Sequence, residues 1–356
     1  MYDAPDKKRP KMKERGAASS LTTDMQLVNY GLPCKNENDE SVDWYVIYKL
    51  PQSVDKPLGS YMYISSDKLS EGWKLSARSI NDSNSIPGLT LRPFYNGLTK
   101  MHILYNDETP DNHQNDNMGH TKGVVMSNET RGLWLIHSVP HYPPTDTYNY
   151  PESAYRFGQT FLCISFNLSS INDIGKQLQY NQPIIYKSAI STGLVQQLPD
   201  INAAIKNETV KVTPWYRLVI LRSTGNEEFL SFAKCSKYGK EIYKDWVSIA
   251  LKNNLFVESW LDGKGKLPSN CSKVYRVRNI EGIRLPFNVS FSSTHDHSKW
   301  TITEDILHTC KWICIGDINR EERQKYRGGG VVCLSSLKLW KIYNTSVTEI
   351  EPCPKN

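Results

Sequence analysis

The sequence predicts an α/β fold made of two related halves, each centred on a β-sheet flanked by helices. The motif Gly119-His120-Thr121-Lys122-Gly123 has a partial second copy, Asp296-His297-Ser298-Lys299-Trp300. Each copy is followed, twelve or thirteen residues after its lysine, by a short apolar segment that ends in a polar turn. Segments with strand and helix character also alternate along both parts of the chain, which is typical of α/β layering.

The first half contains five predicted strands. Runs of aromatic and β-branched residues place four of them at 43–50, 61–64, 101–105 and 161–166, and the fifth is the apolar segment that begins at Trp134 after the first motif. Polar or proline-rich stretches predict irregular loops at about 65–87, 106–117 and 139–157. A weaker helical pattern runs from 194 to 205, and Pro199 interrupts it.

The second half follows a similar plan. Its predicted strands lie at 215–221, 274–277, 312–315 and 331–333. Residues 241–253 predict an amphipathic helix, because Ile242, Trp246, Ile249 and Ala250 recur at helical spacing. The predicted organisation is a basic disordered tail at 1–24, an N-terminal half at 25–200 with the first motif, and a C-terminal half at 201–356 with the second.

Net charge and hydropathy indicate which kinds of partner the protein could have and whether it could span a membrane. The chain has 356 residues and a formal net charge of +6 with neutral histidines, and its eight histidines add positive charge at acid pH. Such a balance suits a polyanionic partner, although modest basicity is also common in proteins without one. No apolar run approaches the length of a membrane-spanning helix, so no membrane span is predicted.

Cysteines and sequons point to the secretory pathway. The eight cysteines include no CxxC pairs with zinc-like spacing, which favours disulfides. Seven Asn-x-Ser/Thr sequons, more than chance supplies, indicate a glycosylated chain. They begin at Asn81, Asn128, Asn167, Asn207, Asn270, Asn288 and Asn344. Residues 1–20 are basic and lack an apolar segment, so a signal peptide is not visible there.

The two His-x-Lys units predict phosphoryl transfer without a metal ion or other cofactor. On an extended chain, residues i and i+2 face the same way, so each unit presents an imidazole and an ammonium together. One neutral imidazole can attack phosphorus while the other, protonated, donates to the leaving oxygen. Lys122 and Lys299 would stabilise the non-bridging oxygens. The polar turns at Ser138 and Asn319 would add neutral hydrogen bonds.

His-x-Lys followed by a strand and Gly-x-x-Asn, here Gly316-Asp-Ile-Asn319, resembles the doubled motif of the phospholipase D superfamily. The first half departs from that pattern, with His137-Ser-Val-Pro140, and the usual Asp five residues past each Lys is replaced by Ser127 and Glu304. These departures resemble one branch, the deoxyribonuclease II family. Further blocks that match this branch, across 31–353, are Gly31-Leu-Pro-Cys34, Gly158-Gln-Thr-Phe-Leu-Cys163 and Arg327-Gly-Gly-Gly330.

The resemblance implies an acid endonuclease, lysosomal or secreted, that acts on double-stranded DNA without a metal ion and leaves 3′-phosphate ends. It implies a phospholipase D-like pseudo-twofold fold with one active site between the halves. By analogy His120 is the nucleophile that forms a phosphohistidine, and His297 is the acid. The implied disulfides are Cys34–Cys163, Cys271–Cys353 and Cys314–Cys333, which leaves Cys235 and Cys310 paired together or free.

Several residues and functions keep two interpretations. His137 would touch phosphate or orient His120, or it is an ordinary buried histidine. His295 and Asp317 would support the site from behind, but His295 with His297 also fits a metal-dependent phosphodiesterase. A third alternative is a DNA-binding or toxin-like protein that keeps the fold without catalysis. The sequence leaves a homodimer open.

Overall fold

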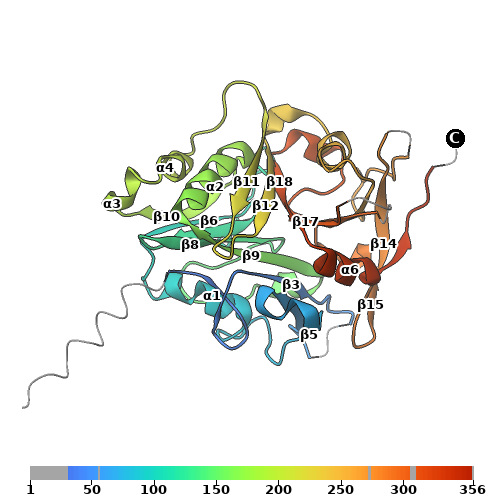
Figure 1. The fold of residues 1–356 in the computed structure, drawn as a ribbon, viewed down its shortest axis with the longest axis horizontal. Coiled ribbons are helices and arrows are strands. Elements are labelled where there is room, and N and C mark those ends of the chain that lie inside the picture. Colours follow the sequence, from blue (N-terminus) through green and yellow to red (C-terminus); the bar gives the residue numbers. More distant parts are fainter. Residues whose placement is uncertain (1–30, 55–56, 272–273, 305–309, 355–356) are drawn as a thin grey trace, which may run out of the picture. The chain divides into compact units, whose positions relative to one another are not determined.

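The computed structural model describes residues 31–54, 57–271, 274–304 and 310–354. The predicted tail at 1–24 lies outside these residues. Two large sheets with helices packed on them make up the described chain (Figure 1), so the predicted α/β class is confirmed. Within the described ranges, no helix has the length and apolar character that crossing a membrane requires.

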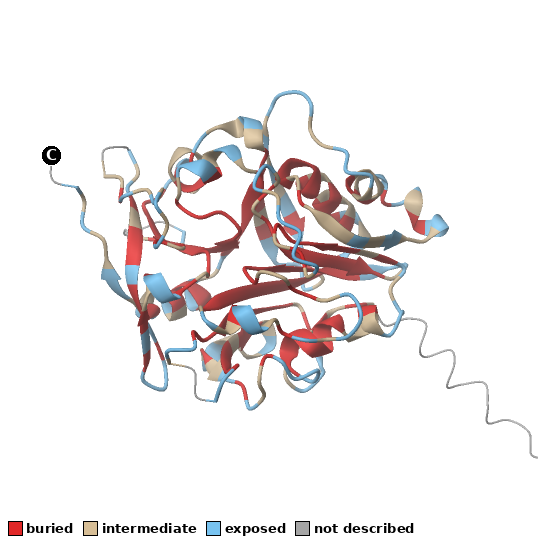
Figure 2. Cartoon of the chain, turned by 180° about the vertical axis from the view of Figure 1, so that it is seen from behind, coloured by how far each residue is buried: buried red, intermediate tan, exposed pale blue. Residues whose placement is uncertain are grey.

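The first sheet has eight strands in the spatial order β10-β6-β7-β8-β9-β3-β4-β5, all paired antiparallel. Its strands are β3 (Trp44–Lys49), β4 (Tyr61–Ser65), β5 (Lys74–Leu75), β6 (Met101–Tyr105), β7 (Gly123–Ser127), β8 (Arg131–His137), β9 (Gln159–Asn167) and β10 (Ile185–Ile190). The central strands β3 and β7 are buried along their whole length because both faces of the sheet are covered (Figure 2). A small separate ribbon pairs β1 (Cys34–Lys35) with β2 (Ser41–Val42).

The second sheet has nine strands in the order β11-β12-β18-β17-β16-β13-β14-β15, with β19 paired to β14. All its pairs are antiparallel except β13 with β14. The strands are β11 (Tyr216–Arg222), β12 (Glu228–Lys234), β13 (Leu255–Glu258), β14 (Val277–Leu285), β15 (Val289–Ser292), β16 (Trp300–Thr303), β17 (Trp312–Gly316), β18 (Gly329–Ser335) and β19 (Val347–Ile350).

The two sheets repeat one strand order. In the first, β3-β9-β8-β7-β6 are neighbours in that order; in the second, β12-β18-β17-β16-β13 are neighbours. Numbered along the chain within each set, both read 1-5-4-3-2, and every pair is antiparallel. Each His-x-Lys unit comes directly before the third strand of its set, β7 or β16. Neither unit is itself part of a strand.

Helices and short helical turns fill the connections. The α-helices are α1 (Ile86–Tyr95), α2 (Leu168–Asn181), α3 (Thr192–Val195), α4 (Pro199–Ile205), α5 (Ser248–Ala250) and α6 (Leu337–Ser346). The tighter or wider turns are η1 (Ser66–Glu71), η2 (Glu152–Tyr155), η3 (Ser236–Tyr238), η4 (Tyr243–Val247), η5 (Ser293–His295) and η6 (Arg323–Tyr326).

Helix α2 packs against strands of both sheets, as its place beside β11, β12 and β8 in Figure 1 illustrates. Ile171, Ile174 and Leu178 recur at helical spacing and are fully buried, which gives the helix its apolar face. Gly175 faces α4, where an added Cβ would lie only 2.3 Å from the backbone nitrogen of Ile201. One apolar cluster therefore runs through both sheets and α2.

Most predicted strands are confirmed within a residue or two, but three predictions were wrong. Residues 241–253 form the π-turn η4 and the short α5 instead of one amphipathic helix; Ile249 stays 56% exposed, and the positive φ of Lys252 ends the segment. The strand predicted at 274–277 begins at Val277. Helix α1 falls partly in a predicted loop, because Pro87 in its first turn reads as a breaker although that position tolerates proline.

Three disulfides have the pairing that the resemblance implied. Cys34–Cys163 links β1 to β9, Cys314–Cys333 joins directly opposed residues of β17 and β18, and Cys271–Cys353 ties the segment after β19 to the loop before β14. Cys235 is buried and Cys310 is exposed, and both are free thiols. The two left-over cysteines therefore do not pair with each other.

Asp43 ties the start of β3 to the turn between β11 and β12. Its carboxylate accepts hydrogen bonds from the hydroxyls of Ser223 (2.6 Å) and Thr224 (2.9 Å) and from the backbone N–H of Gly225 (2.5 Å). Gly225 must be glycine here, because an added Cβ would lie 2.7 Å from that carboxylate. This contact joins the two sheets at the edge of the shared core.

Two buried carboxyl groups lie behind the second His-x-Lys unit. Asp296 accepts hydrogen bonds from the Ser298 backbone N–H (3.0 Å), from the Ser298 hydroxyl (2.5 Å) and from the Tyr48 hydroxyl of β3. Glu258 of β13 accepts one from Ser293 (2.7 Å), while its second oxygen has no partner among the described residues. Burial raises the pKa of both groups, and the charge of Asp296 raises the pKa of Glu258 further.

Replacing Asp43 by Ala should lower the free energy of unfolding by about 2–4 kcal/mol, because three hydrogen bonds to a charged acceptor are lost together. Urea unfolding followed by tryptophan fluorescence measures the change. Asp43→Asn keeps two of the acceptor contacts and should lose less than half as much. Equal stability of wild type and Asp43→Ala would contradict the role given to this contact.

Glu258 should make the protein less stable as the pH rises. A folded-state pKa above the unfolded value stabilises the fold at acid pH, and this contribution is lost as the pH climbs through the folded pKa. Each unit of elevation corresponds to about 1.4 kcal/mol. Relative to wild type, Glu258→Gln should therefore gain stability progressively as the pH rises above about 4.5, the ordinary pKa of a glutamate, measured by thermal unfolding.

The matched control is Glu349→Gln, which removes an exposed carboxylate on β19. Its stability difference from wild type should stay constant over the same pH range. A Glu258→Gln difference that is also constant with pH would rule out the buried carboxyl as the source of the pH dependence.

Candidate active site

The two His-x-Lys units meet at one cavity of about 340 Å³. Six residues predicted for the site line it, and they come from both sheets: His120, Lys122, Ser138, His297, Lys299 and Asn319. Asp107, Phe157, Trp260, Gln324 and Arg327 also line it; the sequence analysis assigned none of them to the site and named Arg327 only within a block that matches the family. Units that are 177 residues apart in the chain thus share one site.

Residues of the second half hold the first His-x-Lys unit in place through hydrogen bonds. The backbone N–H of His120 donates to the carbonyl of Gly328 (2.8 Å), and the Thr121 hydroxyl donates to the Asp317 carboxylate (2.7 Å). Gly119, the residue before His120, has no room for a side chain, since a Cβ would lie 1.8 Å from the carbonyl oxygen of Asn181. The motif's glycine therefore serves close approach of two backbones.

The ring of His120 is oriented by a backbone carbonyl. Its Nδ1 lies 2.7 Å from the carbonyl oxygen of Asp317, and because a carbonyl only accepts, Nδ1 carries the proton in the neutral ring. Nε2 then holds the free electron pair, 3.8 Å from a carboxylate oxygen of Asp107. Burial and then Lys122 hold the pKa of His120 well below its usual value. The imidazole therefore favours its neutral form, with the electron pair of Nε2 free.

Asp107 joins the cations of the cavity. It forms ion pairs with Lys122 and with Arg327 (3.0 Å) and is almost fully buried. Burial alone would raise the pKa of this carboxyl, but the charges of Lys122 and Arg327 and the hydrogen bond from Lys122 outweigh burial and lower it. Asp107 lies two residues past the end of β6, beside the start of β7. Its place directly after a strand is the only feature of the sequence that could have suggested it as a site residue.

Residues of the first half hold the second His-x-Lys unit in place through hydrogen bonds and ring contacts. The backbone N–H of His297 donates to the carbonyl of Gly158 (2.9 Å), and the N–H of Gly158 donates to the carbonyl of His295 (2.9 Å). The His297 ring stacks on Phe157 with 4.2 Å between centroids and meets the edge of Trp260 at 4.1 Å. Aromatic contacts from both halves thus fix the second imidazole.

Positive charge without full compensation surrounds His297. Burial, then Lys299 and Lys122, lower the pKa of His297 to about 2. Burial and Lys122 likewise lower the pKa of Lys299 to about 7, although its ammonium donates to the His297 carbonyl (2.6 Å). An anion in the cavity would relieve the repulsion among these groups.

Two neutral side chains stand at the cavity edge. The Ser138 hydroxyl donates to Gln159 (2.5 Å) and accepts the backbone N–H of Thr160 (3.0 Å). Asn319 accepts the backbone N–H of Trp260 with its side-chain oxygen (3.3 Å), which leaves its amide N–H groups for a ligand. These contacts fix both side chains at the positions the polar turns predicted.

Asp317 connects the two halves behind the cavity. Its carbonyl orients His120, its carboxylate binds Thr121, and its backbone N–H donates to Gly330 (3.0 Å). Burial, despite the hydrogen bond from Thr121, raises the pKa of Asp317 to about 7. Asp317 therefore supports the first unit without lining the cavity.

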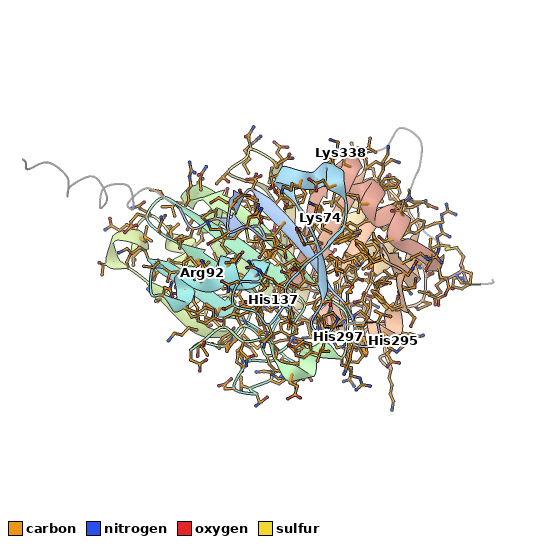
Figure 3. All side chains as sticks on the ribbon, turned by 90° about the horizontal axis from the view of Figure 1, so that it is seen from below. Lys74, Arg92, His137, His295, His297 and Lys338 are labelled. Atoms are coloured by element: carbon orange, nitrogen blue, oxygen red, sulfur yellow. A yellow bond between two sulfur atoms is a disulfide. The ribbon has the colours of Figure 1, made fainter. Side chains whose placement is uncertain are left out.

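Two further predicted site residues, His137 and His295, do not line the cavity. His137 is buried, accepts the backbone N–H of Val139 (3.2 Å) and packs against Tyr142 and Phe161, so the alternative of an ordinary buried histidine fits best. His295 is exposed and its Nδ1 contacts Ser292 (3.1 Å), although it comes from the same segment as His297 (Figure 3). Neither side chain touches the cavity.

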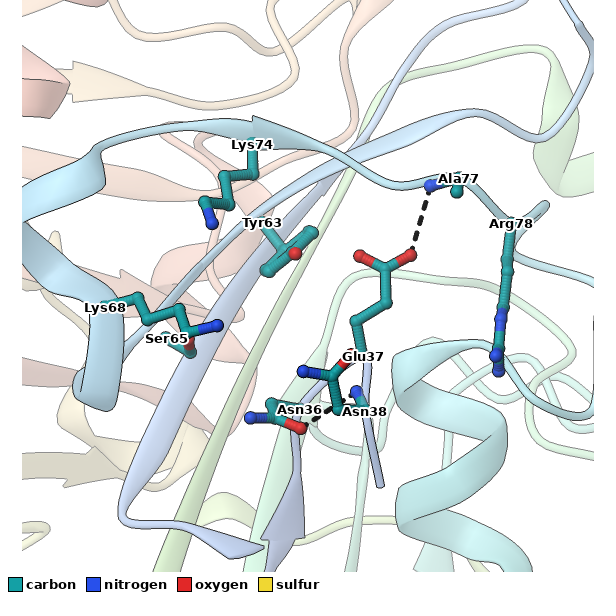
Figure 4. A pocket seen from close by; sticks show the side chains of 9 residues that line it. All are labelled: Asn36, Glu37, Asn38, Tyr63, Ser65, Lys68, Lys74, Ala77 and Arg78. Atoms are coloured by element: carbon teal, nitrogen blue, oxygen red, sulfur yellow. Dashed lines mark hydrogen bonds between the residues drawn. The ribbon is translucent and has the colours of Figure 1, made fainter. Parts of the chain in front are cut away.

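Other features carry no part of this site. In the described ranges, no three His, Cys, Asp or Glu side chains are grouped as a metal cluster. A separate hollow of about 390 Å³ beside β4 and β5 holds Lys68, Lys74 and Arg78, but the carboxylate of Glu37, bonded to the N–H of Ala77 (3.1 Å), occupies its centre (Figure 4). Arg320 is buried among Asn279 and Glu241.

Comparisons with known proteins agree across nearly the whole chain. A family profile described as Deoxyribonuclease II matches residues 33–353. Deoxyribonuclease-2-alpha of Mus musculus is 39% identical over 336 residues, which cover 90% of this chain and 94% of that protein. Plancitoxin-1 of Acanthaster planci is 38% identical, covering 95% and 97%, and Deoxyribonuclease-2-beta of Homo sapiens is 33% identical, covering 96% and 100%.

Among solved structures, a polyphosphate kinase from Porphyromonas gingivalis aligns with a TM-score of 0.28 and 11% identity, covering 63% of this chain and 31% of that one, which is too low to support a shared fold. The family profile and the identities to the curated relatives are sufficient by themselves. This chain belongs to the deoxyribonuclease II family of hydrolases.

Proposed function

We propose that the protein is an acid endonuclease that hydrolyses the phosphodiester bonds of double-stranded DNA and leaves 3′-phosphate ends. The observation that carries this proposal is the single cavity lined by His120, Lys122, His297 and Lys299. Two imidazoles supply a nucleophile and an acid, and two ammonium groups match the charge of a phosphate. The names of the relatives, deoxyribonucleases 2 alpha and beta, support DNA as the substrate.

The reaction proceeds in two steps. First, Nε2 of His120 attacks phosphorus, the P–N bond forms, the bond from phosphorus to O5′ breaks, and His297 gives its proton to that oxygen. Second, His297 takes a proton from water, the water oxygen attacks phosphorus, and the P–N bond breaks. The strand keeps a 3′-phosphate, and His120 returns to its neutral form.

The lysines take the role that metal ions fill in many phosphoryl-transfer sites. At about 4 Å and an effective dielectric of about 20, each ammonium–oxygen contact is worth about 4 kcal/mol before desolvation. Lys122 is already balanced by Asp107, whereas Lys299 bonds only to a neutral carbonyl among the described residues. We therefore assign the larger share of phosphate binding to Lys299, and metal independence follows from this assignment.

The low pKa of His297 in the empty site makes the acid step depend on substrate. At contact distance a phosphate anion favours the imidazolium by about 4 kcal/mol, which brings the pKa of His297 back into the acid range. The fraction of His297 that is protonated then rises as the pH falls. The acid optimum results from this group, because His120 stays neutral throughout.

The proposal includes a phospholipase D-like pseudo-twofold architecture, with halves at 25–200 and 201–356 that each supply one His-x-Lys unit. The repeated order of five strands supports it, as does the position of each unit before the third strand. The three disulfides and the seven sequons support a lysosomal or secreted glycoprotein, since disulfides persist in oxidising compartments.

Cleavage of supercoiled plasmid in acid and in excess chelator tests the proposal. Wild type should nick the plasmid, while His120→Ala and His297→Ala should each lose about a thousandfold in rate, because a nucleophile or an acid is gone. His295→Ala is the matched control and should keep wild-type activity, since its ring does not line the cavity. Loss of wild-type activity in chelator would contradict metal independence.

Binding of DNA should take up a proton. We expect His120→Ala, which binds without cleaving, to take up about half a proton per site at about pH 5, because a phosphate contact of about 4 kcal/mol raises the pKa of His297 by about three units. Titration calorimetry in buffers of different ionisation enthalpy measures this number. In the double variant His120→Ala/His297→Gln the uptake should vanish. An uptake that is unchanged in the double variant would assign the proton to another group.

A further inference from the structure

A second cavity, of about 650 Å³, adjoins the proposed catalytic cavity. The two share a wall made of Glu321, Gln324 and Arg327. Beyond that wall the second cavity is bounded by Arg323 and Tyr326 of η6 and faces open solvent. A strand of nucleic acid that places one phosphate between the histidines would therefore continue into this space or leave on the opposite side.

The turn η6 is held rigidly against the catalytic cavity. Lys234, fully buried at the end of β12, donates hydrogen bonds to the carbonyls of Gln324 (2.9 Å), Lys325 (3.2 Å) and Arg327 (2.5 Å). The side chain of Gln324 accepts the backbone N–H of Asn319 (2.7 Å). Because the same turn is bonded to a cavity residue, the position of Tyr326 relative to the site is fixed before any ligand arrives.

Two exposed side chains of this turn, Tyr326 and Arg323, make no ring contact and no ion pair with the other described residues. Tyr326 is 60% exposed and makes no ring contact with another described residue. Arg323 is exposed and forms no ion pair within the described part of the chain. An exposed aromatic ring beside an unpaired guanidinium suits a nucleotide, since the ring stacks on a base and the guanidinium binds a phosphate.

The remaining charges of the second cavity nearly cancel. Asp116 lies 3.9 Å from the guanidinium of Arg327, and Glu321 lies on the shared wall. A cavity with this balance does not attract a polyanion through net charge alone. Recognition there must come from the ring of Tyr326 and from one phosphate contact, which favours a single nucleotide over a long stretch of backbone.

We propose that this second cavity is a nucleotide subsite next to the scissile phosphate, in which Tyr326 stacks on a base of the cleaved strand and Arg323 binds its phosphate. The subsite rests on the proposed nuclease function and adds to it a specific contact outside the catalytic groups. Because an aromatic ring stacks on any base, the subsite favours nucleic acid without selecting a sequence. It also favours a strand whose bases are accessible.

Two substrates separate the subsite from the catalytic groups. A short single-stranded oligonucleotide reaches both cavities, whereas bis(p-nitrophenyl) phosphate is too small to reach beyond the first. Tyr326→Ala should raise KM for the oligonucleotide about tenfold with little change in kcat, and Tyr326→Phe should restore it, because the stacking ring is kept. Hydrolysis of bis(p-nitrophenyl) phosphate should be unchanged in both variants.

Arg323→Gln should lower the slope of log KM against log salt by about 0.7 for the single strand, the value for one lost phosphate contact. Phe287→Ala and Arg284→Gln are the matched controls, since they remove an exposed ring and an exposed arginine on or beside β14. Both should behave as wild type with both substrates.

An unchanged KM for the oligonucleotide in Tyr326→Ala would overturn the subsite, as would an equal loss with both substrates. Failure of the nuclease function would look different, because wild type would then hydrolyse neither substrate. Fluorescence anisotropy of a labelled oligonucleotide bound to His120→Ala, with and without Tyr326→Ala, still tests the subsite in that case. Equal affinity of these two variants would refute it.

Discussion

The burial of two lysine ammonium groups in one cavity is the constraint on which the site depends. Lys122 and Lys299 are almost fully buried; Lys122 disfavours the charge of Lys299, and both disfavour a charge on the neighbouring histidines. Asp107 balances Lys122 directly, and Lys299 bonds only to a carbonyl among the described residues. Lys299 therefore has no carboxylate partner among the described residues, and in the proposed function a phosphodiester supplies that negative charge.

Holding these cations in place requires both halves of the chain. The segment of His120 is anchored on Asp317 and Gly328, and the segment of His297 is anchored on Gly158 and on Phe157. Each His-x-Lys unit is thus positioned by residues from the opposite half. Because these anchors are mostly backbone hydrogen bonds, the relative placement of the units depends mainly on the path of the backbone.

The buried carboxyl groups behind the second unit fit the same acid chemistry. Glu258 and Asp296 have raised pKa values, so the fold accommodates them most readily in their protonated forms. Tyr48 brings a hydroxyl from the first sheet to Asp296, which places this group at a junction between the sheets. Low pH therefore favours stability through Glu258 and Asp296, and in the proposed function it favours catalysis through His297.

The sequence by itself determined the α/β class, most of the strands and the pair of His-x-Lys units, because alternation, β-branched runs and a doubled motif are local patterns. The sequence also predicted that Ser138 and Asn319 belong to the site, since each follows the corresponding strand of its half, β8 or β17. Patterns of this kind survive in one dimension because strand period and motif spacing are set by the local geometry of the backbone.

Only the tertiary structure showed which residues contact the two His-x-Lys units. Asp107 and Arg327 lie 220 residues apart in the chain; Asp107 belongs to no motif, and the Arg-Gly-Gly-Gly block gives no partner for Arg327, so no local pattern joins them. It likewise moved His137 into the core and left His295 exposed, although both stood near the predicted site in sequence. The reason is physical: burial, ion pairing and the pKa of each group depend on distances across the fold, which sequence separation does not encode.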